Sequence, residues 1–137
     1  MTKASLYADE EGLQLDNQLC FKLYAASRAV IRAYKPMLDQ LGLTYPQYLA
    51  MLVLWEWQQQ PPALPTVKAL GERLLLDSGT LTPLLKRLEA SGLVERQRDP
   101  QDERRVRITL TPGGRALRDD AESVPACVLR GSRTALP

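Results

Sequence analysis

Histidine is absent from this chain of 137 residues, and cysteine occurs only twice. Without histidine the protein can hold neither a Ser-His-Asp triad nor a Cys-His pair, which excludes the commonest forms of nucleophilic catalysis. Two cysteines also leave few soft ligands, so a structural zinc site or a zinc hydrolase is a poor interpretation. We therefore expect no catalytic site, no metal and no cofactor.

Long apolar runs are missing as well. The longest one, over residues 48–55, is far shorter than the ~20 residues that a membrane-spanning helix needs. The first twenty residues are polar and acidic and contain no apolar segment of signal-peptide length. We expect a cytoplasmic protein, in which Cys20 and Cys127 would normally be reduced.

A large net charge is also absent, since the net charge is only +2, but the charges are unevenly placed. Residues 1–17 hold one lysine against four acids, so residues 18–137 carry a surplus of five positive charges. We expect residues 1–15 to be a flexible acidic leader and residues 16–137 to form one domain. The basic surplus permits nucleic-acid binding without proving it.

The stretch from Leu76 to Gly92 predicts the helix around which the domain is built. Its leucines recur at i, i+3, i+4 and i+7 and so share one apolar stripe: Leu81, Leu84, Leu85 and Leu88. The side chains of Asp77 and Ser78 can cap its start, and Gly92 can end it in a left-handed conformation. If Ser78 is the cap, Pro83 lies past the first turn, whereas Thr80 as the cap would place it in that turn, and the pattern leaves both open.

Three helices are predicted before this one. Apolar positions from Leu19 to Tyr34 indicate a long amphipathic helix that is capped by Asp16 or Asn17 and interrupted at Pro36. A capping box at residues 44–47 opens a helix that is apolar almost all round over residues 48–57 and should be the buried centre of the domain. A short helix over residues 66–75 follows a proline-broken loop.

A hairpin and a last helix are predicted after it. Residues 92–98, which alternate over their second half, and residues 105–110, which alternate throughout, indicate two strands around a turn at residues 99–102. Thr111 then begins a helix with apolar positions Ala116, Leu117 and Ala121, and Pro125 breaks or kinks that helix. The residues beyond Pro125 are weakly patterned.

This order of elements is that of a winged helix-turn-helix, a mainly α fold with a small β-hairpin wing (α+β). In such a fold the second helix of the pair enters the major groove of DNA, while the hairpin follows the backbone or enters the minor groove. The charges alone would fit an ordinary solvated surface, but the ordered set of elements favours DNA binding. We expect the contacts to come from the first turns of the 76–92 helix, its basic residues and the hairpin tip: Asp77, Ser78, Thr80, Thr82, Lys86, Arg87, Arg104 and Arg105.

Three segments, residues 44–56, 76–89 and 99–106, resemble a known protein family. They closely resemble the organic-hydroperoxide-sensing repressors of the MarR family, over roughly residues 15–125. The resemblance implies a homodimer, repression of a peroxide-detoxification gene from a pseudo-palindromic operator, and release from DNA on oxidation by an organic hydroperoxide. It also assigns dimerisation and sensing to residues 16–60 and 112–137, and DNA binding to residues 66–110.

In that family a reactive cysteine near the start of the first helix is hydrogen-bonded by two tyrosines, and Cys20, Tyr34 and Tyr45 match these positions in type and spacing. The thiolate is the species that attacks a peroxide, and a helix N-terminus with hydroxyl donors favours that form. Apolar neighbours such as Phe21, Met51 and Trp55 would favour organic peroxides. Without the resemblance, a structural thiol and core tyrosines would be the better interpretation.

Cys127 is the remaining thiol that could condense with an oxidised Cys20. It lies in the segment that resembles the family's dimerisation region, so by analogy with the two-cysteine members it would pair with Cys20 of the other subunit. The alternative is a passive Cys127, with Cys20 capped by a small thiol. The chain departs from the family at residues 130–137, whose composition would extend the final helix poorly.

Two other functions remain open. The protein could bind DNA constitutively or in response to a small ligand, with incidental thiols. It could also be a thiol peroxidase, although an arginine or histidine constellation near the thiol would then be expected. The resemblance favours a redox-switched repressor that is not an enzyme.

Overall fold

The computed structural model describes the backbone of residues 10–135 and the side chains of residues 11–129. After two short 3-10 helices, η1 (Glu10–Leu13) and η2 (Leu15–Asn17), the elements are six helices and two strands. In chain order these are α2 (Leu19–Leu41), α3 (Tyr45–Gln59), α4 (Val67–Leu74), α5 (Ser78–Ala90), β1 (Val94–Arg98), β2 (Val106–Leu110), α6 (Pro112–Ala121) and α7 (Val124–Ala135). Residues 1–9 of the expected flexible leader lie outside the described residues.

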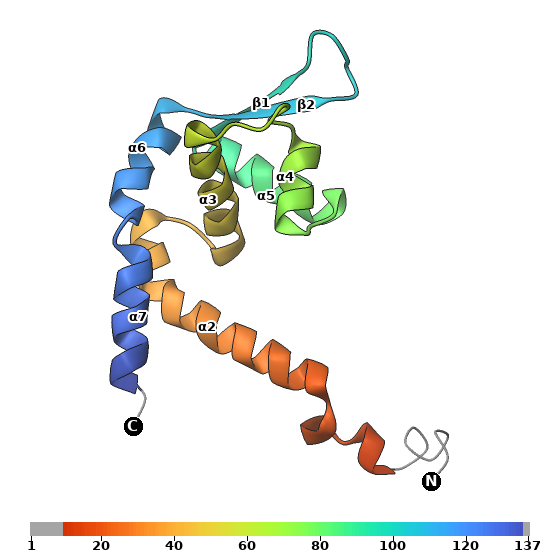
Figure 1. Cartoon of the computed structure of the whole chain (residues 1–137), viewed down its shortest axis with the longest axis vertical. Coiled ribbons are helices and arrows are strands. Elements are labelled where there is room, and N and C mark those ends of the chain that lie inside the picture. Colours follow the sequence, from red (N-terminus) through yellow and green to blue (C-terminus); the bar gives the residue numbers. More distant parts are fainter. Residues whose placement is uncertain (1–9, 136–137) are drawn as a thin grey trace.

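The elements form a head and a stem (Figure 1). The head contains α3, α4, α5 and the hairpin of β1 and β2. The stem contains α6 and α7, which follow one another along one side, and α2, which runs away from the head toward the N-terminus. This arrangement confirms the predicted winged helix-turn-helix. Within the described residues, no helix is long and apolar enough to cross a membrane.

Helix α5 begins where the sequence predicted, and its cap is one of the predicted candidates. The N-cap is Asp77, whose side chain accepts a hydrogen bond from the Thr80 N–H, so neither Ser78 nor Thr80 caps the helix. Pro83 consequently lies inside α5, past its first turn. The predicted leucine stripe is confirmed, since all four leucines are buried, and Gly92 takes the expected left-handed conformation with φ +77°.

Helix α3 is the buried centre of the head. The predicted capping box is present, with Thr44 and Gln47 bonded to each other's backbone N–H groups. Most of the helix lies in the core, including Met51, Leu54 and Trp55. The Trp55 indole donates to the Gly114 carbonyl at 2.9 Å and so joins α3 to the start of α6.

The hairpin is antiparallel, and Val94 pairs with Leu110 and Arg98 with Val106. Its core-facing side chains are Val94 and Ile108, both buried. The segment before α4 extends the sheet at its edge, because Ile108 N–H donates to the Pro65 carbonyl at 3.0 Å and Thr66 forms a bridge with Arg107. The wing is therefore anchored to the helix-turn-helix along β2.

Helix α2 differs from the prediction in two ways. Its N-cap is Gln18, without a side-chain cap, whereas Asp16 and Asn17 lie in η2. The helix also continues past Pro36 to Leu41 and ends at Gly42. Its predicted apolar stripe is real but uncovered by this chain, since Leu19, Leu23 and Val30 are 72%, 64% and 50% exposed.

The C-terminal segment forms two helices rather than one with a weakly patterned tail. Helix α6 ends at Ala121, before Pro125, and α7 begins at Val124, so that Pro125 falls in the first turn of α7. A proline is tolerated there because the N–H groups of a first turn have no partner within the helix. Helix α7 continues to Ala135, further than the composition of residues 130–137 suggested.

Candidate functional site

Helices α4 and α5 pack closely at a small residue. A methyl group on Gly71 would lie 3.0 Å from the Leu76 carbonyl oxygen and 3.2 Å from Leu81, so the turn between the helices is tight. Thr66 caps α4 by accepting the Ala69 N–H, and Leu75 ends the helix in a left-handed conformation with φ 58°. These contacts fix the angle at which α5 is presented.

The first turn of α5 is open to solvent. Ser78 and Thr80 are exposed and Thr82 is half-buried, while Lys86 and Arg87 are exposed further along the helix. Asp77 is exposed too, and its hydrogen bond from the Thr80 N–H, 2.8 Å long, lowers the pKa of its carboxyl. Asp77, itself one of the predicted DNA contacts, therefore also caps α5.

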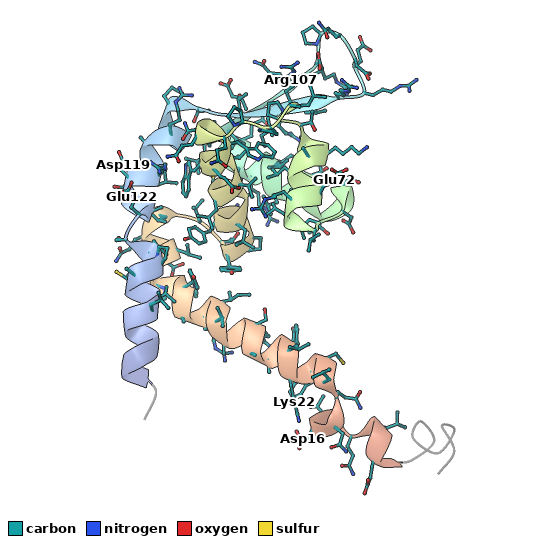
Figure 2. The ribbon with its side chains drawn as sticks, viewed as in Figure 1. Asp16, Lys22, Glu72, Arg107, Asp119 and Glu122 are labelled. Carbon is teal, nitrogen blue, oxygen red and sulfur yellow. The ribbon has the colours of Figure 1, made fainter. Side chains whose placement is uncertain are left out.

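The wing is organised by Asp99, at the end of β1. Its carboxylate is 2% exposed, accepts the Gln101 N–H at 3.0 Å and pairs with the Arg107 guanidinium at 3.4 Å. The Gln101 hydrogen bond, and then the charges of Arg107 and Arg105, lower the pKa of this carboxyl despite its burial. Figure 2 shows Arg107 on the hairpin.

A second aspartate shapes the tip. Asp102 accepts the Arg104 N–H at 3.0 Å and pairs with the Arg105 guanidinium at 3.6 Å. Both arginines remain exposed. The loop therefore presents two cations on a backbone held by its own carboxylates.

A groove of about 890 Å³ joins the wing to the helix-turn-helix. It runs along successive turns of α4 to the turn before α5, and Arg104 and Arg105 line it from the wing. Of the residues predicted to contact DNA, the groove brings together Ser78, Arg104 and Arg105. The others, from Asp77 to Arg87, lie along α5 outside its lining.

The predicted sensor tyrosines meet where α2 joins α3. The rings of Tyr34 and Tyr45 contact edge to face, with centroids 5.3 Å apart. Sequence reasoning missed a third member, Tyr48, whose ring lies 5.8 Å from Tyr34 and 6.4 Å from Tyr45. Burial and then the two neighbouring phenols raise the pKa of Tyr48. Its place one helical turn after Tyr45 was the available signal.

Cys20 is not brought to these tyrosines within one chain. It is exposed in the first turn of α2, and Tyr34 lies 14 residues further along the same helix, ~21 Å away at the usual helical rise. Lys22, two residues after Cys20, lies at the far end of α2 from the head in Figure 2. Of the expected apolar neighbours, Met51 and Trp55 are buried in the head instead.

Cys127 lies in α7, half-buried, and both cysteines are free thiols. Its N–H donates to the Ser123 carbonyl within the first turn of the helix. Helix α7 packs on α2, although at the end of α2 that is remote from Cys20 (Figure 1). The two thiols are thus on different parts of the stem.

Comparisons with known proteins all find similarity to transcriptional regulators. The family model for the transcriptional regulators SarA/Rot matches residues 32–121. The organic hydroperoxide resistance transcriptional regulator of Bacillus subtilis is 53% identical over 117 residues, which cover 85% of this chain and 76% of that protein.

Two solved structures of AbfR, a protein of Staphylococcus epidermidis, are also similar. Overoxidized AbfR bound to DNA matches with a TM-score of 0.73 and 40% identity, over 92% of this chain and 90% of that one. Disulfide-formed AbfR matches with a TM-score of 0.61 and 43% identity, over 86% and 78%. The chain therefore belongs to the MarR family of winged-helix transcriptional regulators, in the group that includes the SarA/Rot and organic hydroperoxide resistance regulators.

Proposed function

We propose that this protein is a transcriptional repressor that binds a DNA operator in its reduced form and releases it when an organic hydroperoxide oxidises Cys20. The observation that carries the proposal is the combination of a capped, solvent-facing α5 and an arginine-tipped wing with an exposed thiol at the start of α2. The relatives support it, since one is named an organic hydroperoxide resistance regulator and another was solved on DNA. Such a regulator would act in the cytoplasm and would not be an enzyme.

The DNA contacts divide between α5 and the wing. Ser78, Thr80 and Thr82 would donate to phosphates or meet base edges in the major groove, because a helix N-terminus presents hydroxyls and free N–H groups together. Lys86 and Arg87 would contact phosphates from the exposed side of the helix. Arg104 and Arg105 would reach the backbone or the minor groove from the wing tip.

The thiol site would be completed by a second copy of the chain. Cys20 and Tyr34 sit too far apart on one helix to touch, so a hydrogen bond between them has to cross between subunits. The exposed leucines of α2 provide an apolar face for that contact. In this assignment residues 16–60 and 112–137 hold the dimer and the sensor, and residues 66–110 read the DNA.

The chemistry is a two-electron oxidation of sulfur. The Cys20 thiolate attacks the terminal oxygen of the hydroperoxide, and the O–O bond breaks to leave a sulfenic acid and an alcohol once the alkoxide takes up a proton. A thiol can then displace water from the sulfenic acid and form a disulfide. We assign that thiol to Cys127 of the partner subunit, because this bond would pull the stems across the dimer and change the spacing of the two heads.

The test is fluorescence anisotropy of the reduced, full-length protein on DNA from upstream of its own gene, at fixed salt. We expect tight binding that one equivalent of cumene hydroperoxide abolishes and dithiothreitol restores. C20S should bind equally well and ignore the peroxide. C127S should also release DNA, and after an excess of cumene hydroperoxide it should fail to recover fully with dithiothreitol, since a second equivalent oxidises its sulfenic acid to a sulfinic acid.

Each other outcome has a definite meaning. Peroxide-sensitive binding by C20S would overturn the assignment of the sensor. Tight binding that ignores peroxide in the wild type would leave a winged-helix regulator that is constitutive or answers to a small ligand. Consumption of many equivalents of peroxide with a dithiol reductant would favour a thiol peroxidase.

A further inference from the structure

Leu75 combines a strained backbone with an exposed apolar side chain. Within residues 10–135 it is the one residue other than glycine with a positive φ, 58°. Left-handed backbone strains a branched side chain, whereas glycine or asparagine adopts it more easily. The side chain is also 91% exposed, so hydrophobic burial does not offset the backbone strain.

The location of Leu75 suggests what the side chain is for. It lies in the turn between α4 and α5, two residues before the α5 N-cap Asp77. It also lines the groove that continues past Ser78 and along α4 to the wing. Strained and exposed residues that persist at such a turn point to a function rather than to stability.

The groove combines apolar and cationic groups. Leu64, Val67 and Leu76 line it together with Leu75. Three cations, Lys68, Arg104 and Arg105, also line it, against one acid, Glu72, which Figure 2 shows on α4. This pattern complements a DNA strand, whose phosphates are anionic and whose thymines carry a methyl group.

We propose that Leu75 determines part of the DNA sequence preference, through an apolar contact with the 5-methyl group of a thymine at the edge of the major groove. The proposal rests on the proposed DNA-binding function. The thymine methyl is the apolar mark among the polar base edges of the major groove. Contact with it would bury a side chain that is almost fully exposed in the free protein.

The test couples the side chain to the methyl group. The full-length, reduced wild type is first used to select a DNA duplex from a random pool, and each thymine of the selected half-site is then replaced by deoxyuridine, one at a time. We expect one replacement to weaken wild-type binding by about fourfold, which corresponds to burial of one methyl-sized group. L75A should lose about this factor or more on thymine DNA and lose nothing further at that position on uracil DNA.

Two controls separate the contact from stability and from charge. L75G should unfold at a higher temperature than L75A, because it relieves the strain, and should still bind DNA less tightly than the wild type. R105A should weaken binding to every duplex and lower the salt dependence, without altering the deoxyuridine effect.

The outcomes that overturn the proposal are specific. Unchanged affinity in L75A would remove Leu75 from the interface. Equal deoxyuridine effects in the wild type and L75A would show that Leu75 contacts no thymine methyl. Failure of the wild type to select any DNA would instead overturn the proposed function itself.

Discussion

Asp99 shows how one side chain can hold the shape of the wing. Its buried carboxylate ties the Gln101 N–H at the start of the loop to the Arg107 guanidinium on the opposite strand. The Asp99 N–H also donates to the Arg105 carbonyl at 2.8 Å, which closes the base of the loop. The two exposed arginines of the tip are therefore presented by a loop whose conformation depends on a charged aspartate.

The pKa of Asp99 makes this dependence measurable. The hydrogen bond from Gln101 and the nearby arginines lower the pKa in the folded protein below the ordinary value of 3.8. The stabilising contribution is therefore complete at neutral pH, and it is lost as the pH falls below about 4, toward the folded-state pKa. We expect D99N to be less stable than the wild type at pH 7, with a difference that shrinks below pH 4.

Urea unfolding at fixed protein concentration, from pH 7 to pH 2, would check this expectation. The asparagine keeps an acceptor for the Gln101 N–H, so the variant isolates the charge. D119N, on the exposed surface of α6, is the control and should give no such pH-dependent difference. A stability difference for D99N that persists undiminished at pH 2 would contradict the charge-based explanation.

At the scale of elements, the start of α6 joins that helix to α3 and to the hairpin. The Gly114 carbonyl accepts the Trp55 indole from α3, and the Gly114 N–H donates to Thr111, the cap of α6. A methyl group on Gly114 would overlap the Leu93 carbonyl oxygen and lie 3.0 Å from Leu110. The close approach of α6 to the hairpin thus requires the absence of a side chain.

The neighbouring glycine provides a matched comparison. A methyl group on Gly113 would find its nearest atom, the Gly92 carbonyl oxygen, at an ordinary 3.4 Å. We expect G114A to lower the free energy of unfolding by about 1–3 kcal/mol through overpacking. G113A should leave it unchanged or raise it by up to about 1 kcal/mol, because alanine restricts the unfolded chain. Thermal and urea denaturation measure both, and equal effects of the two variants would show that the packing argument is wrong.

Local signals were sufficient to predict the elements of the head. The leucine period of α5, the capping box of α3 and the alternation in the hairpin each depend on residues close together in the chain, and each is confirmed. The predicted cap of α2 was wrong because the sequence pattern does not reveal a competing hydrogen bond of Asn17. Asn17 uses its side chain to donate to the Glu11 carbonyl at 2.8 Å, so it is engaged before α2 begins.

Pro36 and the predicted sensor residues show where local sequence patterns did not suffice. Pro36 costs α2 one hydrogen bond, but the remaining turns of a 23-residue helix carry it through. The pairing of Tyr34 with Tyr45 followed from a family resemblance, and the structure brings the two rings together. The separation of Cys20 from Tyr34 follows from their spacing, because 14 residues of one predicted helix span ~21 Å. The sequence of one chain does not show whether a second copy brings the two side chains together.

At the scale of the whole molecule, the exposed face of α2 is the feature that one chain does not explain. Leu19 and Leu23 are mostly exposed on a helix that extends away from the head (Figure 1). A second copy packed on this face would bury both leucines and would bring each Cys20 toward the partner stem. Completion of the sensor site would then depend on dimerisation.

Substitution of Leu23 tests that link. We expect L23D to behave as a monomer in sedimentation equilibrium, where the wild type has twice the mass of the chain, because a dimer would bury two aspartates at the interface. DNA affinity should fall by on the order of 10²-fold or more, since each head would bind its half-site without the other. L64D, a partly exposed leucine before α4, should remain dimeric and controls for an added charge in the sedimentation measurement alone, because Leu64 lines the groove beside the wing. A dimeric L23D that responds normally to peroxide would mean that the subunits meet through another surface, and Cys20 would then need a different partner.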